Sequence, residues 1–435
     1  MSPTFAWAKG FDNTVQLWSY GVALDGSGNC YFTGAFGNTL DFGGGPLESP
    51  YSKKSVFLAS YEPSGAFRFA KHFPSTTSLT RGKAVALDHD DNIYLSGGYA
   101  YEINFGGEDL MGGGETDVYL ARFAQDGTHH FSKTFSSGGF AWGNSLAFDS
   151  HGNVYVAGSF AGSADFGGGS LSSHGYSVTL GALSDIFVAS YDSTGAFRFA
   201  KGFGGLGSEQ ANALALDGND NVYVVGTFEQ SVDFGGGELV SAGGTDIFLA
   251  SFTSDGVHRF SKRFGNSESD EGHALAVSGR GHVTIGGSFS NSVDFGGGPL
   301  VMSSWNVGFL ASYDATGAHR FSLPLGDPPT GSWVTVRSIV ADRADNLYIT
   351  GSFNSALALG GGLVSAGGDD IFVAGFSSDG TYGFSKGFGS LGDDEGLGIA
   401  VDDSGNLYVT GNIDRDVDFG SGLVPGGIFF LKLAP

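Results

Sequence analysis

The segments NSLAFDSHGNVYVAGSF (residues 144–160) and DIFVASYDSTGAFRFAKGF (residues 185–203) decide the fold. They are rich in β-branched and aromatic residues, and Gly, Asp, Asn and Ser bound the apolar runs, which is the pattern of short strands. We expect four strands, at 144–149, 153–160, 185–191 and 197–203. Glycine-containing turns join the first strand to the second and the third to the fourth, whereas a longer link joins the second to the third.

Two landmarks of this segment return along the chain. The element Asp-Phe-Gly-Gly-Gly, intact or degenerate, begins at Asp41, Asn104, Asp165, Asp233, Asp294, Ala358 and Asp418. The turn Asp-x-x-x-Asn begins at Asp25, Asp88, Asp149, Asp217, Asp342 and Asp402, and Ser278 takes the place of the aspartate in the fifth copy. Both landmarks recur every 60 to 68 residues, which predicts seven copies of one four-stranded unit.

Four antiparallel strands per repeat are typical of a β-propeller, so we predict an all-β, seven-bladed β-propeller. The two ends of the chain favour a closed ring over an open solenoid, which would need polar caps. Residues 5–11 (FAWAKGF) align with the fourth strands, and residues 427–433 (GIFFLKL) align with the third strands. We therefore expect residues 5–11 to complete the last blade by pairing with residues 427–433.

The repeats give one domain over residues 1–435, divided into blades. We expect blade 1 at about 18–73, blade 2 at about 81–135, blade 3 at about 142–203, blade 4 at about 210–264, blade 5 at about 271–325, blade 6 at about 335–388, and blade 7 at about 395–433 plus 5–11.

The pattern A-L-A-L-D-x-x-G-N-V-Y-V-x-G-x-F, then D-F-G-G-G, then D-I-F-V-A-S-Y-D, resembles the bacterial seven-bladed β-propeller repeat (SBBP) family. The resemblance covers nearly the whole chain, with departures at Ser278, at Leu323-Pro324 and at Ala358-Leu359. It implies a propeller that is secreted or displayed at the cell surface, and it implies no particular reaction.

Composition excludes several classes of protein. The chain has 45 acidic and 21 basic residues and a formal net charge of −24, which argues against a nucleic-acid partner and an anionic membrane surface. Cys30 is the one cysteine, so no internal disulfide forms. No apolar run is long enough to span a membrane, and the start lacks the pattern of a signal peptide, so a cytoplasmic location stays open. We expect a monomer.

The repeated polar residues are explained by turns. A phosphate-binding loop needs a following Lys-Ser/Thr and a helix, so we interpret Asp-Phe-Gly-Gly-Gly as a glycine turn capped by its aspartate, with the phenylalanine wedged between blades. The aspartates of the Asp-x-x-x-Asn turns also read as turn caps, because a calcium site needs six to eight oxygens at one point. We expect no cofactor and no metal, with calcium as the weak alternative.

Variation between repeats concentrates on one face of the ring. Antiparallel strands place the loops between blades and the long links within blades on the same face, which we call the loop face; the tight turns lie on the other, the turn face. Trp7 aligns with core phenylalanines, and the other four tryptophans lie in or beside segments of the loop face. The candidate ligand-binding residues are Trp18, Tyr20, Arg81, Phe140, Trp142, Trp305, Trp333, Arg337, Asp394 and Glu395.

Seven positions, each five residues before the turn Asp or its substitute, are expected to ring the entrance of the central channel. They are Tyr20, Lys83, Asn144, Asn212, His273, Arg337 and Leu397. The leading hypothesis is a non-enzymatic module that binds a carbohydrate or a protein on the loop face. The first alternative is a lyase or hydrolase with His273 as base, Glu271 as orienting acid and Arg337 as anion stabiliser. The second is a purely structural spacer of a larger surface protein.

Overall fold

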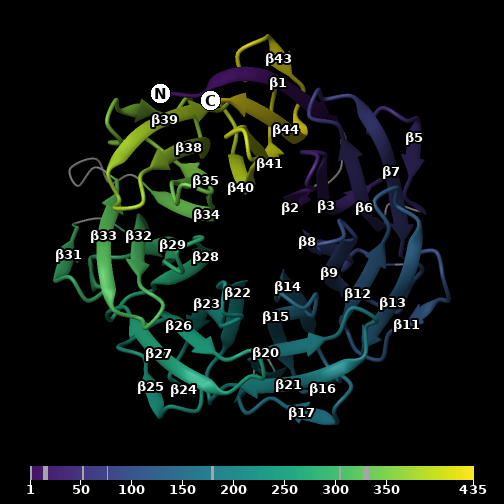
Figure 1. The fold of residues 1–435 in the computed structure, drawn as a ribbon, viewed down its shortest axis with the longest axis vertical. Helices are drawn as coiled ribbons and strands as arrows, with labels where there is room; N and C mark the ends of the chain where they lie inside the picture. Colours follow the sequence, from purple (N-terminus) through teal and green to yellow (C-terminus); the bar gives the residue numbers. More distant parts are fainter. Residues whose placement is uncertain are drawn as a thin grey trace.

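Seven β-sheets stand around a central channel in the computed structural model (Figure 1). The structure describes residues 2–12, 18–50, 53–75, 77–177, 181–302, 305–326 and 333–435. Across these residues each blade is an antiparallel sheet of four strands, and no helix forms that is long and apolar enough to cross a membrane. The predicted seven-bladed propeller is confirmed.

The strands follow the same order from the channel outwards in every blade. The inner strands are β2 (Trp18–Leu24), β8 (Arg81–Leu87), β14 (Ala141–Phe148), β22 (Glu209–Leu216), β28 (Glu271–Val277), β34 (Val334–Ala341) and β40 (Asp394–Val401). The second strands are β3 (Cys30–Gly37), β9 (Ile93–Tyr99), β15 (Val154–Ala161), β23 (Val222–Phe228), β29 (Val283–Phe289), β35 (Leu347–Phe353) and β41 (Leu407–Ile413). The third strands are β6 (Lys54–Tyr61), β12 (Asp117–Phe123), β20 (Ser184–Tyr191), β26 (Asp246–Phe252), β32 (Val307–Tyr313), β38 (Asp370–Phe376) and β44 (Gly427–Ala434). The outer strands are β7 (Phe67–Pro74), β13 (His129–Phe135), β21 (Phe197–Phe203), β27 (His258–Phe264), β33 (His319–Leu325), β39 (Tyr382–Phe388) and β1 (Thr4–Phe11).

The long link of each blade folds into a small hairpin on the outer rim of the ring (Figure 1). These hairpins are β4 (Thr39–Asp41) with β5 (Pro46–Glu48), β10 (Glu102–Ile103) with β11 (Leu110–Met111), β16 (Ser163–Asp165) with β17 (Ser170–Ser172), β24 (Ser231–Asp233) with β25 (Glu238–Val240), β30 (Ser292–Asp294) with β31 (Pro299–Val301), β36 (Ala356–Leu357) with β37 (Leu363–Val364), and β42 (Val417–Asp418) with β43 (Leu423–Val424). In blade 3 the link forms a further short pair, β18 (Tyr176–Ser177) with β19 (Gly181–Ala182).

The Asp-Phe-Gly-Gly-Gly element forms the tip of this hairpin, and its interpretation as a capped glycine turn is confirmed. In blade 1, Asp41 Oδ1 accepts hydrogen bonds from the backbone N–H groups of Gly43 (2.7 Å) and Gly45 (3.0 Å). Phe42 is 2 % exposed and packs on Phe11 of blade 7, with ring centroids 4.9 Å apart, so it is wedged between two blades. Gly44 lies so close to the Phe67 ring that a Cβ would fall 2.5 Å from it.

The aspartates of the tight turns cap their own turns, as predicted. Asp25 Oδ1 accepts from the backbone N–H groups of Ser27 (2.9 Å) and Asn29 (2.8 Å), and Asp25 Oδ2 accepts from the Asn29 side chain and from the Tyr31 hydroxyl. The same pattern holds in blade 3, where Asp149 caps residues 151 and 153. These carboxylates are therefore already occupied by hydrogen-bond donors.

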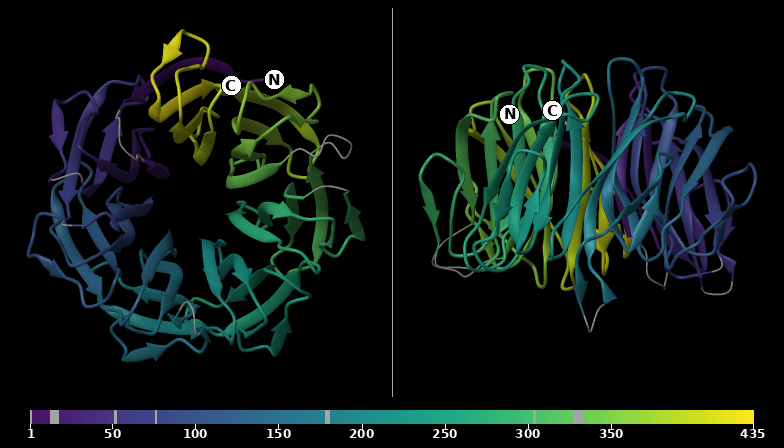
Figure 2. Two further views of the ribbon diagram at one scale, coloured as in Figure 1. Left: turned by 180° about the vertical axis from the view of Figure 1, so that it is seen from behind. Right: turned by 90° about the horizontal axis from the view of Figure 1, so that it is seen from below.

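The ring closes through its two chain ends. β1 pairs antiparallel with β44 from Thr4↔Ala434 to Phe11↔Ile428, with an irregularity between Phe5 and Trp7. The Trp7 ring packs edge-on against Phe430 at 5.3 Å between centroids. The predicted closure of blade 7 by residues 5–11 is confirmed, and Figure 2 shows the two termini side by side.

A hydrogen-bonded clasp joins each of several blades to the next on the turn face. In blade 4, Asp217 accepts from the Tyr223 hydroxyl (2.9 Å), and Arg259 donates to that hydroxyl (3.1 Å) and to Ser251 Oγ (2.7 Å). The other end of the Arg259 guanidinium donates to the carbonyl oxygen of Ala315 in blade 5 (2.9 Å). Arg259, which is hydrogen-bonded to polar groups of blade 4, thereby also bonds to a turn of blade 5.

The cation of the clasp differs from blade to blade. It is Arg68 in blade 1, Arg122 in blade 2, Arg320 in blade 5 and Lys432 in blade 7, which donate to the carbonyl oxygens of Gln125, Ser193, Ser378 and Pro63. Arg68 and Arg320 lie in outer strands, whereas Arg122 and Lys432 lie in the third strands β12 and β44.

Removing residues 1–11 tests the closure. It exposes the edge of β44, an apolar strand with one charge, and removes the buried Phe11 and the packed Trp7, each contributing about 1.5–3 kcal/mol. We expect the truncated protein to aggregate or to melt far below the intact protein in light scattering and calorimetry. Adding the peptide TFAWAKGF should restore part of the loss and a scrambled peptide should not; an unchanged, monomeric truncation would contradict the closure.

Arg259→Met tests the clasp. It leaves the Tyr223 and Ser251 hydroxyls and the Ala315 carbonyl without their charged donor, so we expect the free energy of unfolding to fall by about 1–3 kcal/mol in chemical denaturation. The control Arg415→Met removes an exposed cation from a loop of blade 7 and should change it by less than about 0.5 kcal/mol. Equal effects in the two variants would show that the clasp is incidental.

Candidate ligand-binding face

A β-bulge in each inner strand aims one side chain into the channel mouth. The register against the second strand shifts at the same place in all seven blades, for example between Ser19 and Gly21 and between Gly272 and Ala274. The bulged residues are Tyr20, Lys83, Asn144, Asn212, His273, Arg337 and Leu397. They are the seven positions expected to ring the channel entrance, and all seven line the hollow at its mouth.

A glycine in each second strand makes the bulge possible. A Cβ on Gly34 would fall 1.8 Å from the carbonyl oxygen of Trp18, and one on Gly287 would fall 1.9 Å from that of Glu271. Glycine inside a strand commonly marks a close backbone approach or a bulge. This explains the glycine of the repeated V-Y-V-x-G-x-F pattern, which fixes the bulge while leaving the bulged side chain free to vary.

The hollow at the mouth has a volume of about 350 Å³ and continues into the channel beneath it. Its wall includes Trp18, Tyr20, Arg337 and Glu395 of the predicted ligand-binding residues, together with Gln210. The Asn144 and Asn212 side chains each donate to a backbone carbonyl of the next blade, at 2.9 and 2.8 Å. Those two amides therefore join neighbouring blades as well as lining the wall.

Cations and aromatic rings alternate over blades 1 to 3. Arg81 Cζ lies 4.8 Å from the centroid of the Trp18 ring and 5.5 Å from that of Trp142, so the guanidinium sits between two indoles. Lys54 Nζ lies 3.7 Å from the Trp18 ring. Trp18 and Trp142 were predicted in or beside loops of the loop face. They lie at the starts of β2 and β14, are half-buried, and have cations against their rings.

Carboxylates and a histidine occupy the opposite arc, over blades 5 to 7. His273 Nε2 lies 3.0 Å from Glu271 Oε2 and 3.4 Å from Arg337 Nη1, and Arg337 Nη2 lies 3.4 Å from Glu395 Oε1. Burial lowers the pKa of His273 more than Glu271 raises it, and Arg337 lowers it further, so the imidazole is neutral at neutral pH. The structure thus brings together the three residues predicted as base, acid and anion stabiliser.

The other predicted ligand-binding residues lie outside the hollow. Trp305 and Trp333 are neighbours at the boundary of blades 5 and 6, where the backbone N–H of Val334 donates to the Asn306 carbonyl. Phe140 lies in the loop between blades 2 and 3, and these three rings are 44–59 % exposed. Asp394 does not reach the surface: it is fully buried, and its carboxylate accepts from the backbone N–H groups of residues 390 and 414, so it caps a loop.

An apolar rim surrounds the polar mouth, and only part of it was predicted. Five loops that join one blade to the next each expose one large apolar side chain, 40–70 % accessible; they are Leu79, Phe140, Leu206, Trp333 and Leu391. On the turn face, the turns within the described residues expose one such side chain, Val257. The recurrence of a single apolar residue in an otherwise Gly- and Ser-rich loop was a visible signal for Leu79, Leu206 and Leu391.

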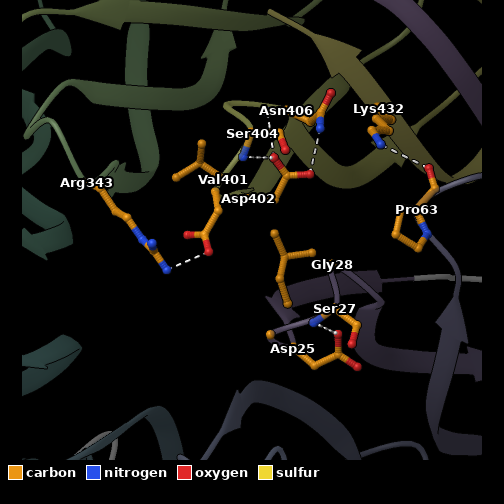
Figure 3. Close-up of a pocket in the computed structure, with 13 residues that line it drawn as sticks. Asp25, Ser27, Gly28, Pro63, Arg343, Val401, Asp402, Ser404, Asn406 and Lys432 are labelled. Carbon is orange, nitrogen blue, oxygen red and sulfur yellow. Dashed lines mark hydrogen bonds and ion pairs between the residues drawn. The ribbon is translucent and has the colours of Figure 1, made fainter.

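A second hollow, of about 450 Å³, lies on the turn face where blade 7 meets blade 1 (Figure 3). Asp402 and Asp25 line it, but their carboxylates are bonded to their own turns, and Lys432 Nζ donates to the Pro63 carbonyl. Over the described part of the chain no three metal-ligating side chains gather in one place. This hollow lies between tight turns of blades 7 and 1, and the aspartates that line it cap those turns.

Glu209, at the start of β22, makes a contribution to stability that depends on pH. It is fully buried, and burial raises the pKa of its carboxyl to about 8 from 4.5. Between these values the folded protein holds more protons than the unfolded chain, so stability falls as the pH rises from about 4.5 to about 8. Glu209→Gln should therefore gain melting temperature relative to wild type between about pH 5 and pH 8.5; a pH-independent difference would contradict the buried, protonated carboxyl.

Known proteins resemble this chain in sequence over part of their length, or in fold. Regulatory protein FlaEY from Caulobacter vibrioides is 27 % identical over 373 residues, which is 80 % of this chain and 38 % of that protein, so this chain spans about two fifths of its relative. The Pan2 WD40 domain of Neurospora crassa has a TM-score of 0.49 at 9 % identity, covering 100 % of this chain and 97 % of its own. Virginiamycin B lyase from Staphylococcus aureus has a TM-score of 0.45 at 8 % identity, with 99 % of both chains covered.

The repeat itself is recognised directly. The SBBP beta-propeller repeat model matches residues 138–159, which run into β14 and β15, and residues 382–416, which span β39, β40 and β41. Both matches include an inner strand with its bulge and the glycine-bearing second strand that supports it. The resemblance drawn from the sequence is confirmed in these two segments: the chain carries the SBBP beta-propeller repeat.

Proposed function

We propose that this propeller is a non-enzymatic binding module that uses its loop face to bind a protein partner. The observation that carries the proposal is the difference between the two faces. The loop face has a ring of exposed apolar side chains around a charged mouth, whereas the turns of the turn face expose one large apolar side chain, Val257. Exposed apolar side chains grouped on one face of a soluble protein are typical of an interaction surface.

Carbohydrate is the other ligand class that the sequence left open, and the arrangement of the mouth favours it less. Sugar rings bind to the free faces of aromatic side chains, but Lys54 and Arg81 lie over Trp18, and Arg81 and Lys83 lie over Trp142. Trp305 and Trp333 are neighbours at the boundary of blades 5 and 6, whereas Phe140 lies between blades 2 and 3, and the other members of the apolar rim are leucines. Apolar contacts spread over several blades suit a broad protein surface.

An enzymatic role is the second candidate, because His273, Glu271 and Arg337 are in mutual contact at the mouth. A neutral imidazole beside a carboxylate and a guanidinium has the composition of a general base with an anion stabiliser. Its Nε2 atom, however, is already engaged by Glu271 at 3.0 Å. A lyase or hydrolase role predicts that His273→Ala abolishes turnover and leaves binding of the partner intact.

The double variant Phe140→Ser with Trp333→Ser tests the binding surface. The intact chain is first used for protein capture and on a glycan array, and each candidate ligand is purified and titrated by calorimetry. We expect a protein ligand whose affinity falls at least about tenfold in the double variant, which is the scale of interface hot spots. The rings are on exposed loops, so the melting temperature should stay within a few degrees.

Val257→Ser is the matched control, because it removes an equally exposed apolar side chain from the turn face. It should leave the affinity unchanged. A ligand that binds the double variant as tightly as wild type, or that is lost on Val257→Ser, would contradict the assignment to the loop face. Binding restricted to glycans would replace the protein partner by a carbohydrate.

A further inference from the structure

Three basic side chains gather at the boundary of blades 1 and 2, close to the channel mouth. They are Lys54 at the start of β6 and Arg81 and Lys83 in β8. Lys83 Nζ lies 4.9 Å from the Tyr20 ring and 5.7 Å from the Trp142 ring, and Arg81 lies between Trp18 and Trp142. We call Lys54, Arg81 and Lys83 the cation cluster.

No carboxylate of the described residues neutralises this cluster. None of its three members takes part in an ion pair within that part of the chain, although the protein has 45 acidic and only 21 basic residues. Lys54 is only 7 % exposed, and the Nε atom of Arg81 is buried without a hydrogen-bond partner. Buried charges in proteins are ordinarily paired, so a cluster left unpaired stands ready for an anion.

Burial and the mutual repulsion of the cations oppose their charge. Burial and, to a smaller extent, the Arg81 guanidinium lower the pKa of both Lys54 and Lys83 to about 8. An arriving anion would relieve both effects. The aromatic rings contribute by holding the cations in place, since an ammonium or guanidinium is attracted to a ring face.

The surroundings of the cluster limit the kind of anion. Glu395 lines the same hollow, Glu271 stands across the mouth, and the whole chain carries a net charge of −24. A polyanion would be repelled by these carboxylates and by the long-range field of the protein. A single anionic group in an otherwise uncharged segment fits the local positive charge without that penalty. Lys83 lines the hollow of about 350 Å³ that such a segment would enter, and Lys54 and Arg81 lie against the Trp18 ring in its wall.

We propose that Lys54, Arg81 and Lys83 bind the side-chain carboxylate of an acidic residue that a protein partner inserts into the channel mouth. This inference rests on the proposed function and adds to it the chemistry of the anchoring residue. Arginine supplies paired N–H donors that match a carboxylate, and the two lysines add positive charge nearby. The apolar rim would then contact the segment that flanks the acidic residue.

The first experiment uses small probes on the intact protein. N-acetylglutamate α-amide carries one side-chain carboxylate, and N-acetylglutamine α-amide is its neutral match; inorganic phosphate is the third probe. Ligand-observed NMR and tryptophan fluorescence follow binding, because Trp18 and Trp142 contact the cluster. We expect the glutamate probe to bind at least about tenfold more tightly than the glutamine probe. Equal binding of the two, or binding of phosphate alone, would overturn the proposal of a carboxylate.

Two variants then assign the binding to the cluster. Lys54→Met removes a buried charge that has no counter-ion, so it should lower the affinity for the glutamate probe at least about tenfold while the melting temperature is unchanged or raised. Arg81→Gln should lower the affinity as well. Lys386→Gln, which removes a cation from the outer strand β39, is the control and should change the affinity less than about twofold. Wild-type affinity in Lys54→Met, or a fall in its melting temperature by more than a few degrees, would overturn the proposal.

The same variants separate this inference from the function on which it rests. If a purified protein partner is lost in the rim variant Phe140→Ser with Trp333→Ser but binds Lys54→Met normally, the binding face stands and the anchoring carboxylate is refuted. If the glutamate probe depends on Lys54 and no ligand depends on the rim, the anion site stands and the protein-binding face is refuted.

Discussion

Closure of the ring is the constraint on which the rest of the structure depends. Seven twisted sheets can share one axis only if the last is as complete as the first, and here the outer strand of blade 7 comes from the start of the chain. The clasps on the turn face add to the closure, because each ties a blade to a turn of the next, including blade 7 to blade 1 through Lys432.

At each bulge the glycine of the second strand maintains the fold, whereas the bulged side chain of the inner strand can differ between blades. The inner strand shifts its register by one residue at the bulge, and a glycine in the second strand accommodates the displaced backbone. The bulged side chain contributes little to the packing of its own sheet, because it points into the channel. Tyrosine, lysine, asparagine, histidine, arginine and leucine are therefore all accommodated at equivalent positions, and the mouth acquires a basic, aromatic side and an acidic side on a symmetric scaffold.

The sequence predicts the fold well because the strands and turns are local patterns repeated seven times, and because the two ends of the chain match the two strands that complete the last blade. Counting back five residues from the turn aspartate even identified the residues of the mouth, although the bulge that aims them was overlooked. The site was harder for physical reasons. Asp394 and Glu395 are adjacent in the chain, and only the register of β40 determines that the first is buried and the second lines the hollow. Lys54 escaped notice because its contact with Trp18 joins the first and third strands of a blade, which no local pattern encodes.

The position of the chain ends has a practical consequence for handling the molecule. β1 starts and β44 stops on the turn face, beside one another and on the far side of the ring from the channel mouth and its apolar rim (Figure 2). A tag, a surface linker or a fused domain joined to either end therefore extends from the turn face. A propeller tethered in this way to a sensor chip or a bead presents its channel mouth outward, in one orientation, and keeps it clear of the support.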